Sequence, residues 1–127
     1  MEGENAAALD AVLEALMSIR CGAADTEAQL HALAAQALAL AGIEAEHEAR
    51  LAPRCRIDFM AGGVGIEIKK KRPERARLIA QLTRYAACGQ VRALAVVAPR
   101  GVDLPRAISG KPVRMLALER LWGISLP

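Results

Sequence analysis

Apolar residues near the start of the chain recur three and four positions apart, as they do along one face of an α-helix. This spacing runs through residues 5–20 and predicts an amphipathic first helix. Gly22 follows the run and is the predicted stop, because glycine commonly ends helices. The apolar positions are Leu9, Val12, Leu13, Leu16 and Met17.

A second helix is predicted from the residues that begin and end it. Thr26, with Gln29 three positions later, has the spacing of a capping box, in which each side chain bonds the other residue's backbone N–H. The apolar pattern continues to Leu40, and Gly42 supplies the stop. Small side chains predict a helix face that packs closely against a sheet, and these are Ala32, Ala35 and Ala39.

Beyond the second helix the pattern changes to a period of 2, which is typical of β-strands. Apolar and polar residues alternate over residues 43–50, and Pro53 closes this first predicted strand. Two more strands are predicted over 56–61 and 64–69. Gly62-Gly63 between them readily supplies the positive φ values of a tight hairpin turn.

The remaining chain predicts one more helix and two more strands. Pro73 suits the first turn of a helix that continues to Cys88. The nearly unbroken apolar run over 91–98 is typical of a strand covered on both faces. Residues 105–112 are predicted as a loop or short turn, and residues 113–118 as a last edge strand.

This order of elements predicts an α/β fold with a mixed central sheet flanked by helices. The 127 residues fit one domain, and a hydrophobic content of 54% is enough to form a core. The start of the chain lacks the pattern of an export signal, and no apolar run approaches a membrane span, so we expect a soluble, cytoplasmic protein. Three widely spaced cysteines match no zinc pattern and are expected to be reduced and mostly buried.

The glycine turn sets the register of the predicted hairpin. A two-residue turn at Gly62-Gly63 pairs Phe59 with Ile66 and Ile57 with Ile68. These four apolar side chains then share one face. A slip by one residue would mix apolar and polar side chains, so the pattern supports this register.

The other face of this hairpin carries the candidate chemistry. The same register sets Asp58 opposite Glu67, with Lys69 two residues further on and pointing the same way. Two carboxylates in direct opposition are destabilising, and a Mg²⁺ or Mn²⁺ ion between them would offset that cost. Lys69 could orient a water molecule or stabilise charge on a phosphate. The alternative interpretation is a weak charge cluster on a surface hairpin.

These residues resemble the signature of the PD-(D/E)XK nuclease superfamily. An acidic residue on one strand, Asp58, precedes Glu67-Ile68-Lys69 on the next, which matches the (D/E)-x-K part. The following helix reads Gln81-Leu82-Thr83-Arg84-Tyr85, similar to the Q-x-x-x-Y of RecB-like nucleases. Glu27 lies on the helix before the sheet, where members often carry a glutamate. The predicted order over residues 26–98 agrees with the family's helix, three strands, helix, strand core.

The resemblance implies a metal-dependent nuclease of restriction-endonuclease-like fold that hydrolyses DNA with little sequence preference. It implies that Lys69 assists the attacking water, and that Gln81 and Tyr85 face the site and touch substrate phosphate or brace Lys69. Tyr85 could instead extend an apolar row, and the family's proline is replaced by Ile57. The implied metal ligands are Asp58, Glu67 and the backbone carbonyl of Ile68, with Glu27 holding a metal-bound water or a second ion.

Charge is divided unevenly along the chain and points to a polyanionic partner. Residues 1–49 hold one basic and nine acidic side chains, whereas residues 50–127 hold sixteen basic and five acidic ones. Nucleic acids are bound largely through phosphate neutralisation, although a basic face can also be merely solvated. The predicted DNA-binding side chains are Lys70, Lys71, Arg72, Arg75, Arg77 and Arg84.

Other readings of the sequence remain open. The chain could be a nuclease-like fold that binds nucleic acid or a protein without cutting it. It could also act as a homodimer, with the apolar first helix, outside the inferred core, as the interface. His31 and His47 are interpreted as core or interface histidines, and one of Glu44, Glu46 and Glu48 could replace Glu27 in the site.

Overall fold

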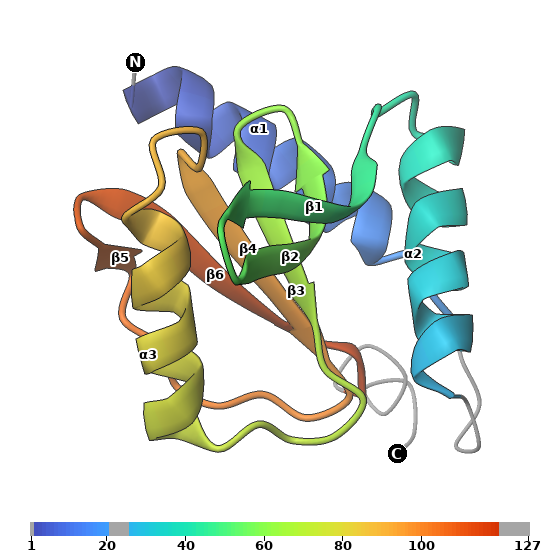
Figure 1. Cartoon of the computed structure of the whole chain (residues 1–127). Coiled ribbons are helices and arrows are strands. Elements are labelled where there is room, and N and C mark those ends of the chain that lie inside the picture. Colours follow the sequence, from blue (N-terminus) through green and yellow to red (C-terminus); the bar gives the residue numbers. More distant parts are fainter. Residues whose placement is uncertain (1, 21–25, 120–127) are drawn as a thin grey trace.

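The computed structural model describes residues 2–20 and 26–119, so the predicted stop at Gly22 lies outside the described residues. The described chain forms three helices and six strands, arranged as a sheet with helices on both faces (Figure 1). In chain order they are α1 (Glu2–Leu16), α2 (Glu27–Leu40), β1 (Glu46–Ala52), β2 (Cys55–Ala61), β3 (Val64–Ile68), α3 (Arg75–Ala86), β4 (Ala93–Ala98), β5 (Ala107–Ile108) and β6 (Lys111–Ala117).

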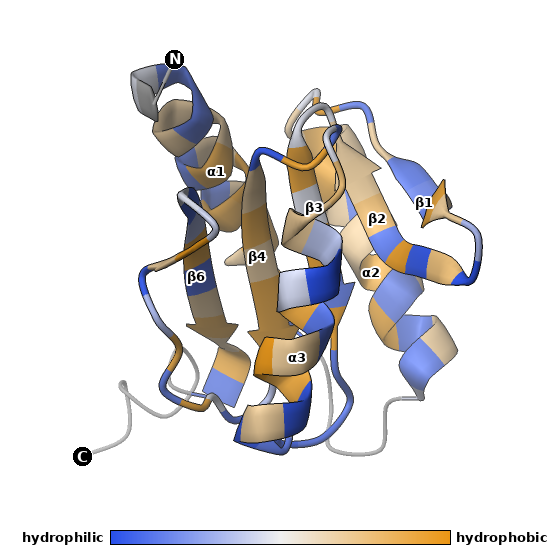
Figure 2. Ribbon diagram, turned by 60° about the vertical axis from the view of Figure 1, so that its left-hand side comes forward, coloured by the Kyte–Doolittle hydropathy of each residue, from blue (hydrophilic) through white to orange (hydrophobic). Residues whose placement is uncertain are grey.

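The sheet is mixed, which confirms the predicted α/β class. Its strands lie in the order β1-β2-β3-β4-β6-β5. β1, β2 and β3 are antiparallel neighbours, β3, β4 and β6 are parallel, and the two-residue β5 pairs antiparallel with β6. Every residue of β4 is buried, as its unbroken apolar run predicts, and Figure 2 shows this strand hydrophobic along its length.

Two apolar clusters form the core, one on each side of the sheet. Leu9, Val12 and Leu16 of α1 are buried among residues of β3 and β4, together with the buried side of α2. The first helix, which precedes the core inferred over residues 26–98, thus buries its apolar face within the chain, and this face is not free to form the suggested dimer interface. The second cluster joins α3 to the opposite side of the sheet. None of the described helices is long and apolar enough to cross a membrane.

The ends of the helices differ from prediction in ways that local hydrogen bonds explain. The capping box is confirmed, because the Thr26 hydroxyl accepts from the Gln29 N–H at 3.1 Å and the Gln29 side chain accepts from the Thr26 N–H at 2.8 Å. The first helix ends at Leu16 rather than at residue 20, since the chain tightens where Ser18 donates to the Ala15 carbonyl.

The third helix begins two residues later than predicted, and its cap is a different residue. Glu74 is the N-cap, because its carboxylate accepts from the N–H groups of Ala76 and Arg77, both at 3.0 Å. Pro73 therefore lies before the helix rather than in its first turn. A negative charge at this end also suits the helix dipole.

Two further predictions are wrong. The alanine face of α2, formed by Ala32, Ala35 and Ala39, is exposed, because the helix turns its larger Leu30 and Leu38 towards the core. The last strand is not the edge of the sheet. A tight turn at Ser109 and Gly110, both with positive φ, pairs β5 with the first residues of β6. Both the turn and β5 lie within the segment predicted as loop.

The β2–β3 register is confirmed next to the turn and lost further away. Phe59 pairs with Ile66, Met60 with Gly65 and Ala61 with Val64, as predicted. The ladder ends at the first of these pairs. Ile57 does not share a face with Phe59, which is a correction to the prediction.

Ile57 and Phe59 lie on different faces because the strands of the β1–β2 hairpin are distorted between them. Glu48 has a φ of 54°, and its pair with Asp58 is missing from the ladder, although the register is the same on both sides of it. Phe59 packs beneath α1 and α2, whereas Ile57, two residues earlier, packs beneath α3. Alternate strand residues normally share a face, so the strand turns over at Asp58. This turning point places Asp58 between the two layers of helices.

Candidate functional site

Glu67 is the centre of a hydrogen-bonded cluster beneath α3. It is only 5% exposed and comes from the fully buried strand β3. One carboxylate oxygen, Oε2, lies 3.1 Å from the Lys69 ammonium and accepts from the Gln81 amide at 3.1 Å. The other, Oε1, lies 3.0 Å from the Tyr85 hydroxyl. Burial, and next the charge of Asp58, raise the pKa of Glu67, while Lys69 lowers it.

Tyr85 serves both the core and the site. It packs with Leu78 and Leu82 in the second apolar cluster, so the predicted apolar row is correct. Its hydroxyl accepts from Gln81 at 2.9 Å and also lies 3.1 Å from the backbone carbonyl of Arg56. Burial and the charge of Glu67 raise the pKa of Tyr85 far above its ordinary value, so the phenol keeps its proton. Gln81 and Tyr85 therefore brace Glu67, and not Lys69 as the resemblance implied.

Asp58 lies where the hairpin turns over, and its side chain takes the place of a strand hydrogen bond. Its Oδ2 accepts from the backbone N–H of Ile68 at 2.7 Å. In an extended strand the N–H and C=O of one residue point to the same side, so the Ile68 carbonyl also faces Asp58. Burial raises the pKa of Asp58, against the hydrogen bond from Ile68 and the charges of His31 and Lys69. The charge of Asp58 in turn helps to raise the pKa of Glu67, after the larger effect of burial.

Helix α2 supplies a histidine that the sequence analysis set aside. His31 Nε2 lies 3.8 Å from Asp58 Oδ2, and its Nδ1 lies 2.8 Å from His47 Nε2. His47 in turn stacks on Phe59, with ring centroids 4.7 Å apart. Although His31 Nε2 is buried, it has no hydrogen-bond partner among the described residues. A buried nitrogen without a partner is costly, so this atom is suited to a ligand.

A signal for His31 was present in the sequence. It lies four residues after Glu27, and residues four apart share one face of a helix. The charge of Glu27 also contributes to the raised pKa of Asp58, after the larger effects of burial, Ile68, His31 and Lys69. His31 therefore contacts Asp58, and Glu27 is an exposed residue one turn earlier on the same helix. Glu44 and Glu46, the suggested replacements for Glu27, line a different cavity of about 860 Å³.

Basic side chains surround the opening beside Lys69. A depression of about 330 Å³ is lined by Lys69, Gln81 and two arginines of α3, Arg77 and Arg84. Arg75 instead donates to the Asp103 carbonyl at 2.7 Å. The three other predicted DNA-binding residues follow β3: Lys70 and Lys71 are exposed, and the exposed Arg72 lines a second depression with Pro99 and Arg100.

No complete metal centre is found among the described residues. No three His, Cys, Asp or Glu side chains within residues 2–20 and 26–119 converge closely enough to form a complete site. The oxygen donors of Asp58, Glu67 and the Ile68 carbonyl suit a hard divalent cation.

Comparisons of this chain with protein-family models, with curated proteins and with solved structures find no match.

Proposed function

We propose that this protein is a Mg²⁺- or Mn²⁺-dependent nuclease that hydrolyses phosphodiester bonds in DNA with little sequence preference. The observation that carries the proposal is the contact of 3.1 Å between the Lys69 ammonium and the buried carboxylate of Glu67. The charge of Asp58 also raises the pKa of this carboxylate. Two carboxylates and an amine at one sheet end are the residue types that the PD-(D/E)XK signature requires. The element order agrees with the restriction-endonuclease-like core of that family.

Each side chain has a role that follows from its surroundings. Asp58, Glu67 and the Ile68 carbonyl would hold the ion, with His31 Nε2 as a further ligand. Such an ion lowers the pKa of a bound water and stabilises charge on a phosphate. Lys69 orients the attacking water and offsets negative charge, while Gln81 and Tyr85 are positioning residues for Glu67. Arg77 and Arg84 line the approach to Lys69, where they bind phosphates without reading bases.

Cleavage assays test the proposal directly. Linear duplex, circular duplex and single-stranded DNA, and RNA, would be incubated with the protein and Mn²⁺ or Mg²⁺. We expect cleavage that is abolished in Lys69→Ala, while circular dichroism shows an unchanged fold. Lys70→Ala is the matched control, because Lys70 is the exposed neighbour of Lys69, and it should retain activity. Full activity in Lys69→Ala would remove the proposal.

A second candidate function is supported by the same contacts. Both oxygens of Glu67 already have partners in Lys69, Gln81 and Tyr85, so the cluster is satisfied without an ion. This arrangement favours a nuclease-like fold that binds nucleic acid or a partner protein without cutting it. Calorimetry with Mn²⁺ separates the two functions. Binding that Asp58→Asn abolishes supports the nuclease, and an absence of binding supports the silent module.

A further inference from the structure

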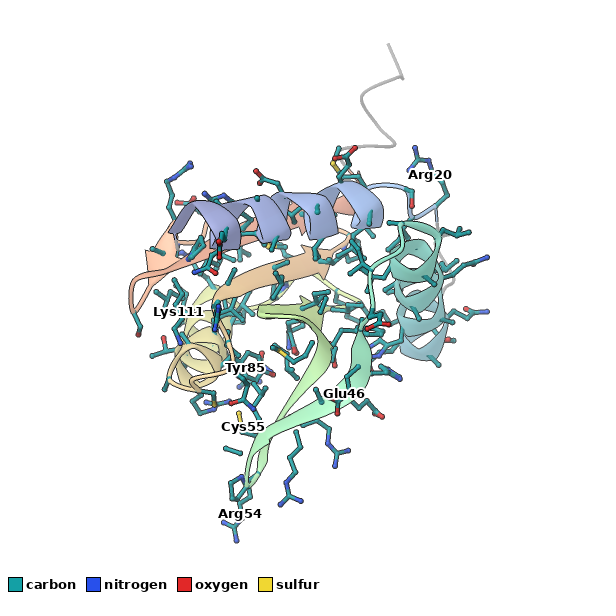
Figure 3. All side chains as sticks on the ribbon, turned by 90° about the horizontal axis from the view of Figure 1, so that it is seen from above. Arg20, Glu46, Arg54, Cys55, Tyr85 and Lys111 are labelled. Carbon is teal, nitrogen blue, oxygen red and sulfur yellow. The ribbon has the colours of Figure 1, made fainter. Side chains whose placement is uncertain are left out.

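Three arginines lie on the β1–β2 hairpin, outside the residues so far assigned to the site. Arg50, Arg54 and Arg56 are all exposed. Arg50 and Arg56 are direct partners across the two strands. Arg54 occupies the turn between the strands with a φ of 60°, and Figure 3 shows it at the far end of the hairpin, away from Arg20.

This arrangement does not serve the stability of the hairpin. Like charges directly opposite each other on neighbouring strands are destabilising. The described part of the chain offers no ion pair to any of the three arginines. An anionic partner would relieve the repulsion, and a partner with several evenly spaced anions would relieve it along the whole hairpin.

The arginines of the two strands lie on the side of the hairpin away from α3. Cys55 and Ile57 pack beneath α3, so strand alternation puts Arg56, between them, on the opposite side. Two residues of a strand span about 6.6 Å, so Arg56 is about that far from Asp58 along β2. Arg54 lies about as far again beyond Arg56. Arg56, the nearest of the three arginines along β2, is therefore two residues from the candidate metal ligand Asp58.

The hairpin is also joined to the buried side of α3. The Tyr85 hydroxyl lies 3.1 Å from the Arg56 carbonyl, and Figure 3 shows Cys55 between Arg54 and Tyr85. The backbone of the hairpin is thus held against α3, while Arg50 and Arg56 lie on the side away from that helix.

We propose that the outer side of the β1–β2 hairpin binds the sugar–phosphate backbone of a nucleic acid where it leads into the site at Asp58. The inference rests on the proposed function for the class of substrate, and it adds the element that holds this substrate. Guanidinium groups suit phosphate oxygens, because their donors match them in pairs. The contacts are to the backbone, so the hairpin contributes affinity and direction without base preference.

Binding measured without cleavage tests the hairpin separately from the chemistry. A labelled 20-base-pair DNA duplex would be titrated by fluorescence anisotropy in EDTA, beside a single strand and an RNA duplex of equal length. The test variant is Arg50→Ala, Arg54→Ala, Arg56→Ala. The control variant loses the same charge at three exposed arginines outside the hairpin, as Arg20→Ala, Arg92→Ala, Arg106→Ala.

We expect the hairpin variant to bind duplex DNA at least about tenfold more weakly than the control variant, with a salt slope lower by about 2 to 3. Its melting temperature should equal or exceed that of the wild type, because a repulsive pair has been removed. Equal losses in the two variants, or wild-type affinity in the hairpin variant, would overturn the inference. Binding through the hairpin by a protein that never cuts would leave the inference standing and remove the proposed nuclease activity. The nucleic acid whose affinity falls most in the hairpin variant is the kind that the hairpin binds.

Discussion

The side chain of Ile57 lies directly over Gly65 of β3, so closely that a Cβ at position 65 would come within 2.7 Å of Ile57 Cδ1. The same Cβ would lie 3.0 Å from Leu94 Cδ2. Gly65 therefore makes room for the hairpin where it turns over, and Asp58 follows Ile57 directly. The position of Asp58, the candidate metal ligand, therefore depends on a glycine at position 65.

Replacing Gly65 with alanine should destabilise the fold by about 1–3 kcal/mol, because the added methyl group overpacks a filled core. Ile57→Val removes Cδ1, the nearest atom, and alone should cost about 0.5–1.5 kcal/mol. The double variant should be more stable than the sum of the two losses implies. Chemical denaturation of all four proteins measures the coupling. Strict additivity would show that the two side chains do not meet.

Removing the Tyr85 hydroxyl should weaken the site more than the fold. Tyr85→Phe keeps the ring in the core but takes a partner from Glu67, which lies 3.0 Å away. We expect a loss of about 10–100-fold in Mn²⁺ affinity or cleavage rate, as is usual when a group that orients a metal ligand is lost. Thr83→Ala, on the exposed side of the same helix, is the control. Equal effects of the two substitutions would argue against a positioning role.

His31 should contribute to metal binding through its unpartnered nitrogen. His31→Ala removes Nε2, which lies 3.8 Å from Asp58 Oδ2, and should reduce Mn²⁺ affinity by at least about tenfold. The exposed Gln36 on the same helix offers a control in Gln36→Ala. Isothermal titration calorimetry measures both variants. An unchanged affinity in His31→Ala would limit the ligands to oxygen donors.

The buried carboxylates should make the effect of metal on stability depend on pH. Burial raises the pKa values of Asp58 and Glu67 above their ordinary 3.8 and 4.5. Their contribution to the free energy of unfolding is therefore fully present below these ordinary values, and is lost as the pH rises through the raised ones. A bound cation favours the ionised pair and should restore stability at neutral pH.

Thermal melts with and without Mn²⁺ check this expectation. The increase in melting temperature on adding Mn²⁺ should be larger at pH 7.5 than at pH 5. It should vanish in the double variant Asp58→Asn, Glu67→Gln. A Mn²⁺ effect of equal size at both pH values, or one that survives in the double variant, would mean that the ion binds elsewhere.

Patterns local in the sequence predicted most of the fold correctly. The capping box of Thr26 and Gln29, the buried strand β4 and the register of Phe59 with Ile66 all appear in the structure. Each depends on neighbouring residues or on one short turn. The errors arose where a choice depends on the rest of the molecule. Which side of α2 faces the core was decided by the leucines, not the alanines.

The residues of the candidate site also differ in whether local sequence patterns could predict them. Asp58, Glu67 and Lys69 were predicted from spacing, through a register that the structure keeps only between Phe59 and the turn. The contact of Lys69 with Glu67 is present, whereas Asp58 is not paired with Glu67 in the ladder. The spacing of His31 from Glu27 put the two on one helix face, but the contact of His31 with Asp58 could not be predicted, since α2 lies over Asp58 only when the sheet and the helices pack. The bracing of Glu67 by Gln81 and Tyr85 likewise requires α3 to lie across β3.

The sequence by itself determined the α/β class, the glycine-turned hairpin and the acidic and basic residue types near it. The tertiary structure alone decided that the hairpin turns over at Asp58, that Ile57 packs over Gly65, and that His31 faces the same carboxylate. The physical reason is that secondary structure follows from short-range periodicity, whereas close packing between distant segments selects which faces and atoms meet.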